Sequence, residues 1–141
     1  MTTKHRRTPR YRASFRVTTE TIDAVRDPVT GEPWFHSSEE DRTVDLSRLG
    51  LRLRAVRAPS VGTRLVLRLH TTEGAPPLEF IARTRWTKVE SEPGPDGMRA
   101  VCGVGVELLG GPRGSLDQFE LLLTELDEAD PDAVAGDRAL G

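Results

Sequence analysis

The sequence predicts a mainly β protein, a small antiparallel barrel of about six strands followed by one amphipathic α-helix. Apolar and polar residues alternate in successive short segments between residues 43 and 108, which is the period of strands with one buried face. Turns join these segments with no helical crossover between them, so antiparallel pairing is favoured. Closure into a barrel would remove the exposed sheet edges. An apolar stripe at helical spacing follows residue 115.

Length and composition indicate one cytoplasmic domain. The chain has 141 residues and a net charge of -2, so no global field draws it toward nucleic acid. Cys102 is alone, which excludes an internal disulfide and fits a reducing compartment. No apolar run approaches the roughly 18 residues of a membrane span, and the basic N-terminus lacks the apolar region of a secretory signal.

The N-terminal part is predicted to be a flexible basic arm, residues 1–12, that orders on binding. Strand pattern begins at Phe15 and slips in phase near Ile22, which indicates a bulge or an early exit from the sheet. Residues 27–31 form a turn, and Trp34 to His36 form a short returning strand. For Trp34 and Phe35 a role as core or lid is favoured over contact with a partner, and residues 37–41 are expected to be a polar loop.

The alternating segments predict strands over residues 43–46, 51–56, 64–70, 78–86 and 101–108, with a loop at residues 91–97. Trp86 shares its phase with Phe80 and Ala82, so packing in the core is favoured over stacking on a ligand. Gly103 and Gly105 lie on one face and permit a bend or a close approach by another element.

The C-terminal helix is expected to begin with a capping box in which Ser115 is the N-cap and Gln118 lies three residues on. Its apolar stripe is predicted to plug the open end of the barrel, with dimerisation as the lesser alternative. The predicted organisation is a basic arm at 1–12, a barrel with its helix at 13–127 and a disordered acidic tail at 128–141.

Two short segments stand out from the strand pattern. The run Asp45-Leu46-Ser47-Arg48-Leu49-Gly50 is a polar turn ending in glycine, set directly before the clearest strand pattern. Taken alone, it is a plain connection between strands. Upstream, Arg6 and Arg10 give an R-x-x-x-R spacing with Arg7 beside them.

Together these segments resemble the two-part signature of PilZ domains, bacterial receptors for the second messenger cyclic di-GMP. The family pattern is R-x-x-x-R on an N-terminal arm and (D/N)-x-S-x-x-G at the start of a barrel strand, and both halves are intact here in the same order. The resemblance covers residues 6–126 and implies a PilZ-like barrel. It implies that the ligand is bound by Arg6, Arg7, Arg10, Asp45, Ser47, Gly50 and Trp86. Arg7 is included because it is adjacent to Arg6, and Trp86 because some PilZ domains carry a tryptophan near the ligand.

The chemistry of the implied ligand suits these residue types. Guanine offers O6 and N7 acceptors to the arginine fork, and guanidinium also stacks on purines and grips phosphate. Following the resemblance, Asp45 would accept from guanine N1 and N2, Ser47 would hold a phosphate oxygen, and Gly50 would keep the backbone clear.

No pattern typical of an enzyme is present. His5, His36 and His70 are scattered without metal-ligand spacing, so no metal site and no catalytic residue is predicted. Cys102 lies in the middle of a predicted strand and is expected to be a small core residue. The Gly103 to Gly105 segment lies inside a strand and is therefore no dinucleotide fingerprint. Cyclic di-GMP is expected as a ligand and no cofactor is expected.

Three functions remain open. The first is a non-enzymatic receptor whose arginine arm closes over cyclic di-GMP and alters the face offered to an unknown protein partner. The second is a PilZ-like interaction module that does not bind nucleotide. The third, nucleic-acid binding, is opposed by the low pI of about 5.9. It would use arginines on the outer face of the barrel, which otherwise are solvated: Arg52, Arg54, Arg68, Arg83 and Arg85.

Overall fold

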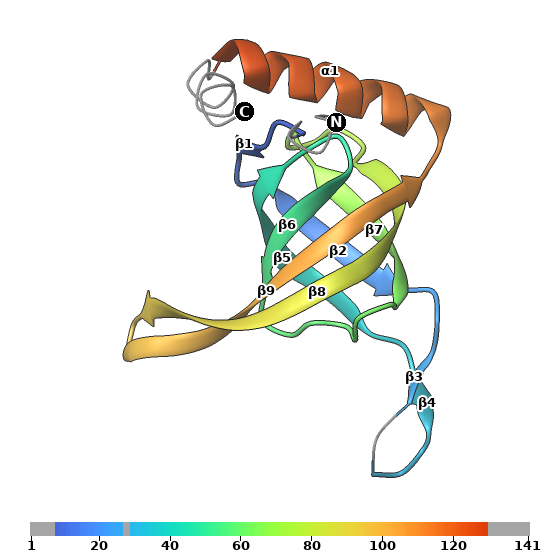
Figure 1. Cartoon of the computed structure of the whole chain (residues 1–141), viewed down its shortest axis with the longest axis vertical. Helices are drawn as coiled ribbons and strands as arrows, with labels where there is room; N and C mark the ends of the chain where they lie inside the picture. The colour runs from blue at the N-terminus through green and yellow to red at the C-terminus, as the bar shows by residue number, and fades with distance from the viewer. Residues whose placement is uncertain (1–7, 27–28, 130–141) are drawn as a thin grey trace, which may run out of the picture.

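A closed antiparallel barrel with one helix across its end forms the body of the protein (Figure 1). The computed structural model describes residues 8–26 and 29–129. Its elements are β1 (Tyr11–Arg12), β2 (Arg16–Thr21), β3 (Val25–Arg26), β4 (Pro33–Trp34), β5 (Ser37–Leu46), β6 (Gly50–Ala55), β7 (Arg64–His70), β8 (Leu78–Gly94), β9 (Gly97–Gly110) and α1 (Arg113–Ala129). No helix in the described part is both long and apolar enough to span a membrane.

The barrel strands follow the order β5-β2-β7-β8-β9-β6, and β6 returns to pair with β5. All of these pairings are antiparallel, so the six strands close into a barrel and the predicted fold class is confirmed. The two-residue strand β1 adds to β5 beside the helix end of the barrel. Tyr11 and Arg12, assigned to the flexible arm by the sequence, are therefore part of the sheet.

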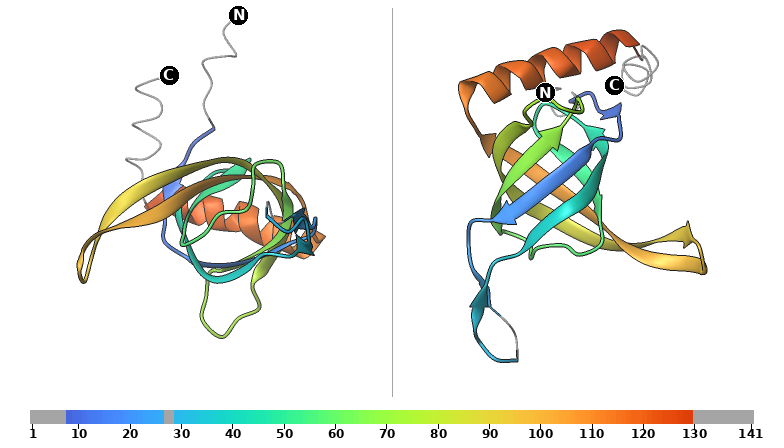
Figure 2. Two further views of the ribbon diagram at one scale, coloured as in Figure 1. Left: turned by 90° about the horizontal axis from the view of Figure 1, so that it is seen from below. Right: turned by 180° about the vertical axis from the view of Figure 1, so that it is seen from behind.

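The core lies where the alternating pattern places it. The inward residues of β6 and β7 are almost fully buried, and they alternate with outward residues, four of which are arginines. Phe80 on β8 is completely buried and meets Phe119 of α1 edge to face, with ring centroids 5.1 Å apart. The helix therefore closes the end of the barrel with its apolar stripe (Figure 2, right view), as its pattern predicts.

Residues 37–41, predicted as a loop, instead begin strand β5. They pair with β2 through Val17↔Asp41 and Glu20↔Ser37, with a bulge between Val17 and Thr19. The prediction was wrong because the buried face here is polar. Asp41 is only 4% exposed, so burial in this segment leaves no apolar alternation to read.

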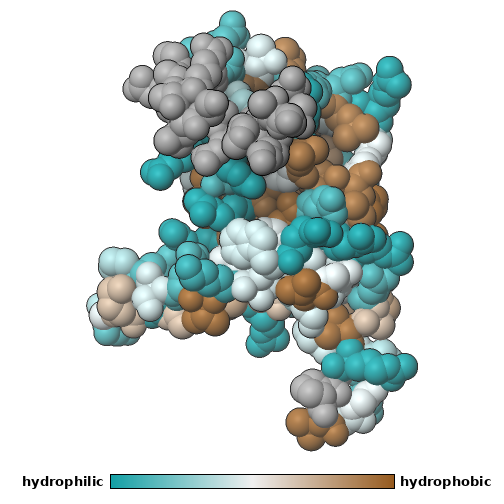
Figure 3. All heavy atoms as spheres, viewed as in Figure 1, coloured by the Kyte–Doolittle hydropathy of each residue, from teal (hydrophilic) through white to brown (hydrophobic). Residues whose placement is uncertain are grey.

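Residues 91–97, also predicted as a loop, belong to a long β8–β9 hairpin that projects from the barrel (Figures 1 and 2). Its turn is tight and contains Gly97 at φ +106°, a conformation that favours glycine. Both faces of the projecting part meet solvent, and polar and apolar residues are mixed along it (Figure 3). Because this part of the hairpin has no buried face, its sequence shows no alternation of apolar and polar residues from which a strand could be predicted.

The segment with Trp34 and Phe35 is a second small hairpin, β3–β4, that extends away from the barrel (Figure 1). Phe35 is 65% exposed and Trp34 is 37% exposed, so the predicted core or lid role is wrong. His36, by contrast, is buried, and its ring lies edge-on to Trp34 at a centroid distance of 5.9 Å. Burial lowers the pKa of His36, and Arg57 lowers it further.

The helix begins two residues earlier than the predicted cap. The carbonyl of Pro112 accepts from the N–H of Leu116 at 3.0 Å, so Ser115 lies inside the first turn and the capping-box prediction is wrong. The Ser115 hydroxyl instead accepts from the backbone N–H of Glu79 on β8 at 2.9 Å. This side chain therefore ties the start of α1 to the barrel. The helix ends at Ala129, and residues 130–141 of the predicted tail lie outside the described residues.

Asp41→Asn is expected to gain stability relative to the wild type as the pH rises. Burial raises the pKa of Asp41 above 3.8, against the opposing hydrogen bond from Ser38 at 2.6 Å. Below the pKa of the unfolded state, Asp41 is protonated in both states and its burial costs no ionisation energy. As the pH rises from there through the folded pKa, the wild type loses stability because the buried carboxyl resists ionisation. Urea denaturation of both proteins at about pH 3 and about pH 7 measures this. A difference in unfolding free energy that is independent of pH would contradict the assignment.

Candidate functional site

The turn between β5 and β6 is closed by Ser47. Its backbone N–H donates to the carbonyl of Gly50 at 2.9 Å, and its hydroxyl donates to the same oxygen at 3.2 Å. Ser47 is only 2% exposed. The hydroxyl that the family resemblance assigns to a phosphate thus shapes the turn in this structure.

Gly50 is required by packing. A Cβ at this position would lie 2.2 Å from the carbonyl oxygen of Val106, because β9 passes directly beside β6 here. The Cβ would be fixed directly to the main chain and the carbonyl is part of it, so neither can rotate away. The glycine of the motif therefore sets the distance between two barrel strands, a reason that the sequence pattern did not reveal.

The centre of the site is the carboxylate of Asp45, which is held by two arginines. Arg10 Nη1 lies 3.0 Å from Oδ1, and Arg52 Nη2 lies 3.0 Å from Oδ2. The pairing of β1 with β5, in which Tyr11 faces Leu46, brings Arg10 to this corner. Asp45 is buried whereas both guanidinium groups remain partly in solvent. One carboxylate thus joins the N-terminal segment to strand β6.

Arg52 is a site residue that was not among the predicted ligand-binding residues. The sequence placed it on the outer face of the barrel, as solvated surface, as part of a basic field under the ligand or as part of a nucleic-acid-binding face. Its contact with Asp45 follows from the register Asp45↔Arg52 between β5 and β6, beside a bulge between Thr43 and Asp45. An irregular register of this kind leaves no signal in the alternation of a single strand.

Trp86 faces outward, so the predicted core position is wrong. Thr84 is fully buried, and the bulge between Thr84 and Trp86 reverses the phase of the strand at this point. The tryptophan is 42% exposed and lies opposite Gly105. A Cβ on Gly105 would lie only 2.1 Å from the indole Nε1, so the glycine leaves room for the ring against the backbone.

These residues line a shallow cavity of about 190 Å³. Arg10 and Arg52 form one side of it, and Trp86 lies with them. Arg85 adds a third guanidinium, which pairs with Glu107 at 3.6 Å. The full lining is Arg10, Ser47, Leu49, Gly50, Leu51, Arg52, Arg85, Trp86, Gly105, Val106 and Glu107. The cavity combines guanidinium donors, a carboxylate beside them and an indole, which suits a planar ligand that carries negative charge.

The seven predicted site residues fall into three groups. Arg10, Ser47, Gly50 and Trp86 line the cavity, and Asp45 does not line it but holds Arg10 and Arg52 with its carboxylate. Arg6 lies outside the described residues, as does the seventh predicted residue, Arg7. No group of His, Cys, Asp and Glu side chains suited to a metal ion occurs within residues 8–26 and 29–129.

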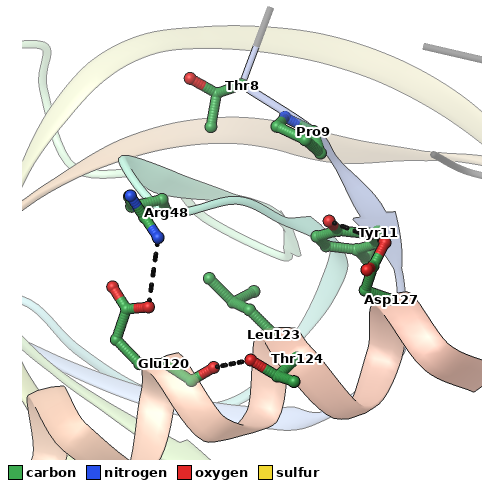
Figure 4. Close-up of a pocket in the computed structure, with 8 residues that line it drawn as sticks. All are labelled: Thr8, Pro9, Tyr11, Arg48, Glu120, Leu123, Thr124 and Asp127. Atoms are coloured by element: carbon green, nitrogen blue, oxygen red, sulfur yellow. Dashed lines mark hydrogen bonds and ion pairs between the residues drawn. The ribbon is translucent and has the colours of Figure 1, made fainter. Parts of the chain in front are cut away.

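A second cavity, of about 540 Å³, lies between the same turn, the N-terminal segment and α1 (Figure 4). Figure 4 shows Arg48 of the turn reaching Glu120 of the helix, with Nη2 and Oε2 3.3 Å apart. Tyr11 donates its hydroxyl hydrogen bond to Asp127 at 3.4 Å. The turn therefore lines the cavity beside Asp45 through Ser47 and contacts the helix through Arg48.

Comparisons with known proteins give one family match and two similar folds. The PilZ domain model matches residues 4–125. The sequence matches no curated protein. The fold is similar to a structure described as the PilZ domain with c-di-GMP of YcgR from Escherichia coli, with a TM-score of 0.58, 15% identity and coverage of 91% of this chain and 96% of that one.

A second similar structure is MrkH, described as a c-di-GMP-dependent transcription regulatory factor. Its TM-score is 0.55 at 15% identity, and the match covers 86% of this chain and 50% of that one. At this identity both structures support the fold alone. The family model spans most of the sequence, including the arm, the turn and the barrel. The chain therefore belongs to the PilZ domain family.

Proposed function

We propose that this protein is a non-enzymatic receptor for cyclic di-GMP that binds the ligand at the cavity beside Asp45. The observation that carries the proposal is the pair of arginines on one buried carboxylate, next to an outward-facing tryptophan. Membership of the PilZ family supports it. The similar structure from YcgR, a PilZ domain with c-di-GMP, also supports it.

Each group of the cavity matches a group of the ligand. The guanidinium of Arg10 or Arg52 meets the O6 and N7 acceptors of guanine or a phosphate oxygen. Asp45 accepts from the N1 and N2 donors of guanine. Trp86 offers an aromatic face on which a base stacks, an interaction worth about 1–3 kcal/mol. Arg6 and Arg7 precede Arg10 on the same segment and add further cationic donors to the ligand.

The Arg10–Asp45 pair gives a simple exchange on binding. The Arg10 side chain is 61% exposed, and ion pairs this open to water contribute little, about 0–1 kcal/mol. Guanine competes for the carboxylate, and the released arginine turns onto the ligand. The N-terminal segment then closes over the cavity at little cost.

The helix carries the signal onward in this proposal. Tyr11 joins the N-terminal segment to Asp127, and Arg48 joins the ligand-binding turn to Glu120. A ligand that moves the segment or the turn strains both contacts on one face of α1 (Figure 4). The exposed face of the helix thereby changes, and a protein partner reads that change.

Arg10→Ala is expected to weaken cyclic di-GMP binding by about ten- to a hundredfold, since one charge-assisted hydrogen bond is worth roughly 1.5–3 kcal/mol. Calorimetric titration of the wild type and the variant measures the loss. Arg113→Ala is the control, because its side chain is 91% exposed and lies at the start of α1. No heat with the wild type would favour the interaction module that binds no nucleotide. Equal affinity of wild type and Arg10→Ala would remove the arm from the proposal.

Gly105→Ala is expected to keep the fold and weaken the ligand. The added methyl occupies the place of the indole, and the flexible side chain of Trp86 yields before the backbone does. The base then loses its stacking surface, so affinity falls by about tenfold. Because Trp34 is common to both proteins, the difference in tryptophan fluorescence between them reports the displaced indole, and titration reports the affinity. Unchanged affinity together with a changed emission spectrum would exclude a role for Trp86.

A further inference from the structure

A row of basic residues crosses the outer face of the barrel, and its end on β6, Arg54, lies two residues along the strand from Arg52 of the cavity beside Asp45. Arg16 on β2 lies directly opposite Arg42 on β5 and opposite His70 on β7. Arg42 in turn lies opposite Arg54 on β6. Three arginines and a histidine thus stand in consecutive register across four neighbouring strands. The strands of this face are seen from behind in the right view of Figure 2.

Like charges directly opposite one another destabilise a sheet unless a carboxylate neutralises them. Arg54 forms an ion pair with Glu92, at 3.4 Å. Arg16 and Arg42 do not: among the residues that the structure describes, no ion pair joins either of them to a carboxylate. Glu20 on β2 and Glu79 on β8 are both bound to Arg68.

Both arginines are nevertheless fixed in position. Arg42 donates from Nε to the Ser14 hydroxyl and from Nη2 to the Ser14 carbonyl, each at 2.8 Å. Arg16 Nη2 donates to Nδ1 of His70 at 3.3 Å, which requires a neutral imidazole with its proton on Nε2. The pKa of His70 is lowered by burial and by Arg16 and Arg68, in agreement with that form.

The two arginines open into a groove of about 600 Å³, within the range of small-molecule sites. Ser14 and Phe15 line it together with residues 71–75 and 77 of the β7–β8 connection. None of its lining residues belongs to the cavity beside Asp45. Among the residues that the structure describes, Glu73 is the one carboxylate that lines the groove, and its negative charge opposes the binding of a long polyanion.

We propose that Arg16 and Arg42 form a second anion site, which takes a single phosphoryl group from a small molecule. Two guanidinium forks on neighbouring strands supply the charge and donors that a phosphate dianion requires. Phe15, which also lines the groove, offers an apolar contact to the rest of the ligand. The phosphoryl group belongs either to a free phosphate ester or to a lipid headgroup, and the two sources share this chemistry.

Inorganic phosphate is the probe for the site, and the imidazole resonances of His70 in the full chain are the readout. Phosphate is expected to shift these resonances in the wild type. The double variant Arg16→Gln, Arg42→Gln is expected to bind it about tenfold more weakly or worse. Arg57→Gln, on the β6–β7 connection, is the control. A titration of the double variant that matches the wild type would overturn the site.

Stability and specificity supply the remaining tests. Arg16→Gln relieves like-charge repulsion, so its melting temperature without ligand is expected to equal or exceed that of the wild type. A clear fall would show that Arg16 is structural. The affinity for cyclic di-GMP is expected to be unchanged in Arg16→Gln. A fall in this affinity as large as the fall in phosphate affinity would show that the row and the cavity beside Asp45 form one site, which would overturn the proposal of a second site. Glycerol 3-phosphate and vesicles containing phosphatidic acid separate the two sources, and binding to neither would also overturn the proposal.

Discussion

Replacing Asp45 by alanine is expected to weaken cyclic di-GMP binding by about a hundredfold or more. The substitution removes the acceptor for guanine and the anchor that holds Arg10 and Arg52 at 3.0 Å each. At least two charge-assisted hydrogen bonds are lost, each worth roughly 1.5–3 kcal/mol. Calorimetric titration measures the affinity directly.

The fold is expected to survive this change, since Arg10 and Arg52 both remain in contact with water once the carboxylate is gone. A thermal melt checks that point. Asp23→Ala is the matched control: Asp23 also pairs with an arginine, Arg64, at 2.8 Å, but it does not line the cavity. If Asp23→Ala and Asp45→Ala bind the ligand equally well, the Asp45 corner is not the binding site.

Gly50→Ala is expected to destabilise the folded protein by about 1–3 kcal/mol or more, the usual cost of overpacking. The new methyl would stand 2.2 Å from the main-chain oxygen of Val106, so β6 and β9 must separate to admit it. Urea denaturation measures the loss in unfolding free energy.

Gly110→Ala is the control for this prediction, because a Cβ at the end of β9 would meet nothing within 4 Å. It is expected to be neutral or slightly stabilising. If the two alanine variants are equally stable, the close approach of β6 and β9 does not explain the glycine of the motif.

The alternation of leucine with arginine made the barrel predictable from sequence. Leu65, Leu67 and Leu69 on β7 are buried while their neighbours face outward, so two-residue periodicity suffices there. The periodicity fails where a polar residue is buried or an apolar residue is exposed. Asp41 is polar but buried and Phe35 is apolar but exposed, so the location of each is the opposite of what its polarity predicts.

The site was predictable to the extent that local chemistry defines it. The glycine-terminated turn and the arginine before the first strand lie together through the Arg10–Asp45 pair. Arg52 and Trp86 were misjudged because bulges in β5 and β8 set their positions. A bulge depends on pairing between strands, which a single sequence pattern does not contain.

A crystal structure of this protein with cyclic di-GMP tests the central claim most directly. The account predicts a guanine against the Trp86 indole, its edge bonded to Asp45, with Arg10 turned from the carboxylate onto the ligand. Ligand density elsewhere on the barrel, with the Arg10–Asp45 pair unchanged, would contradict it.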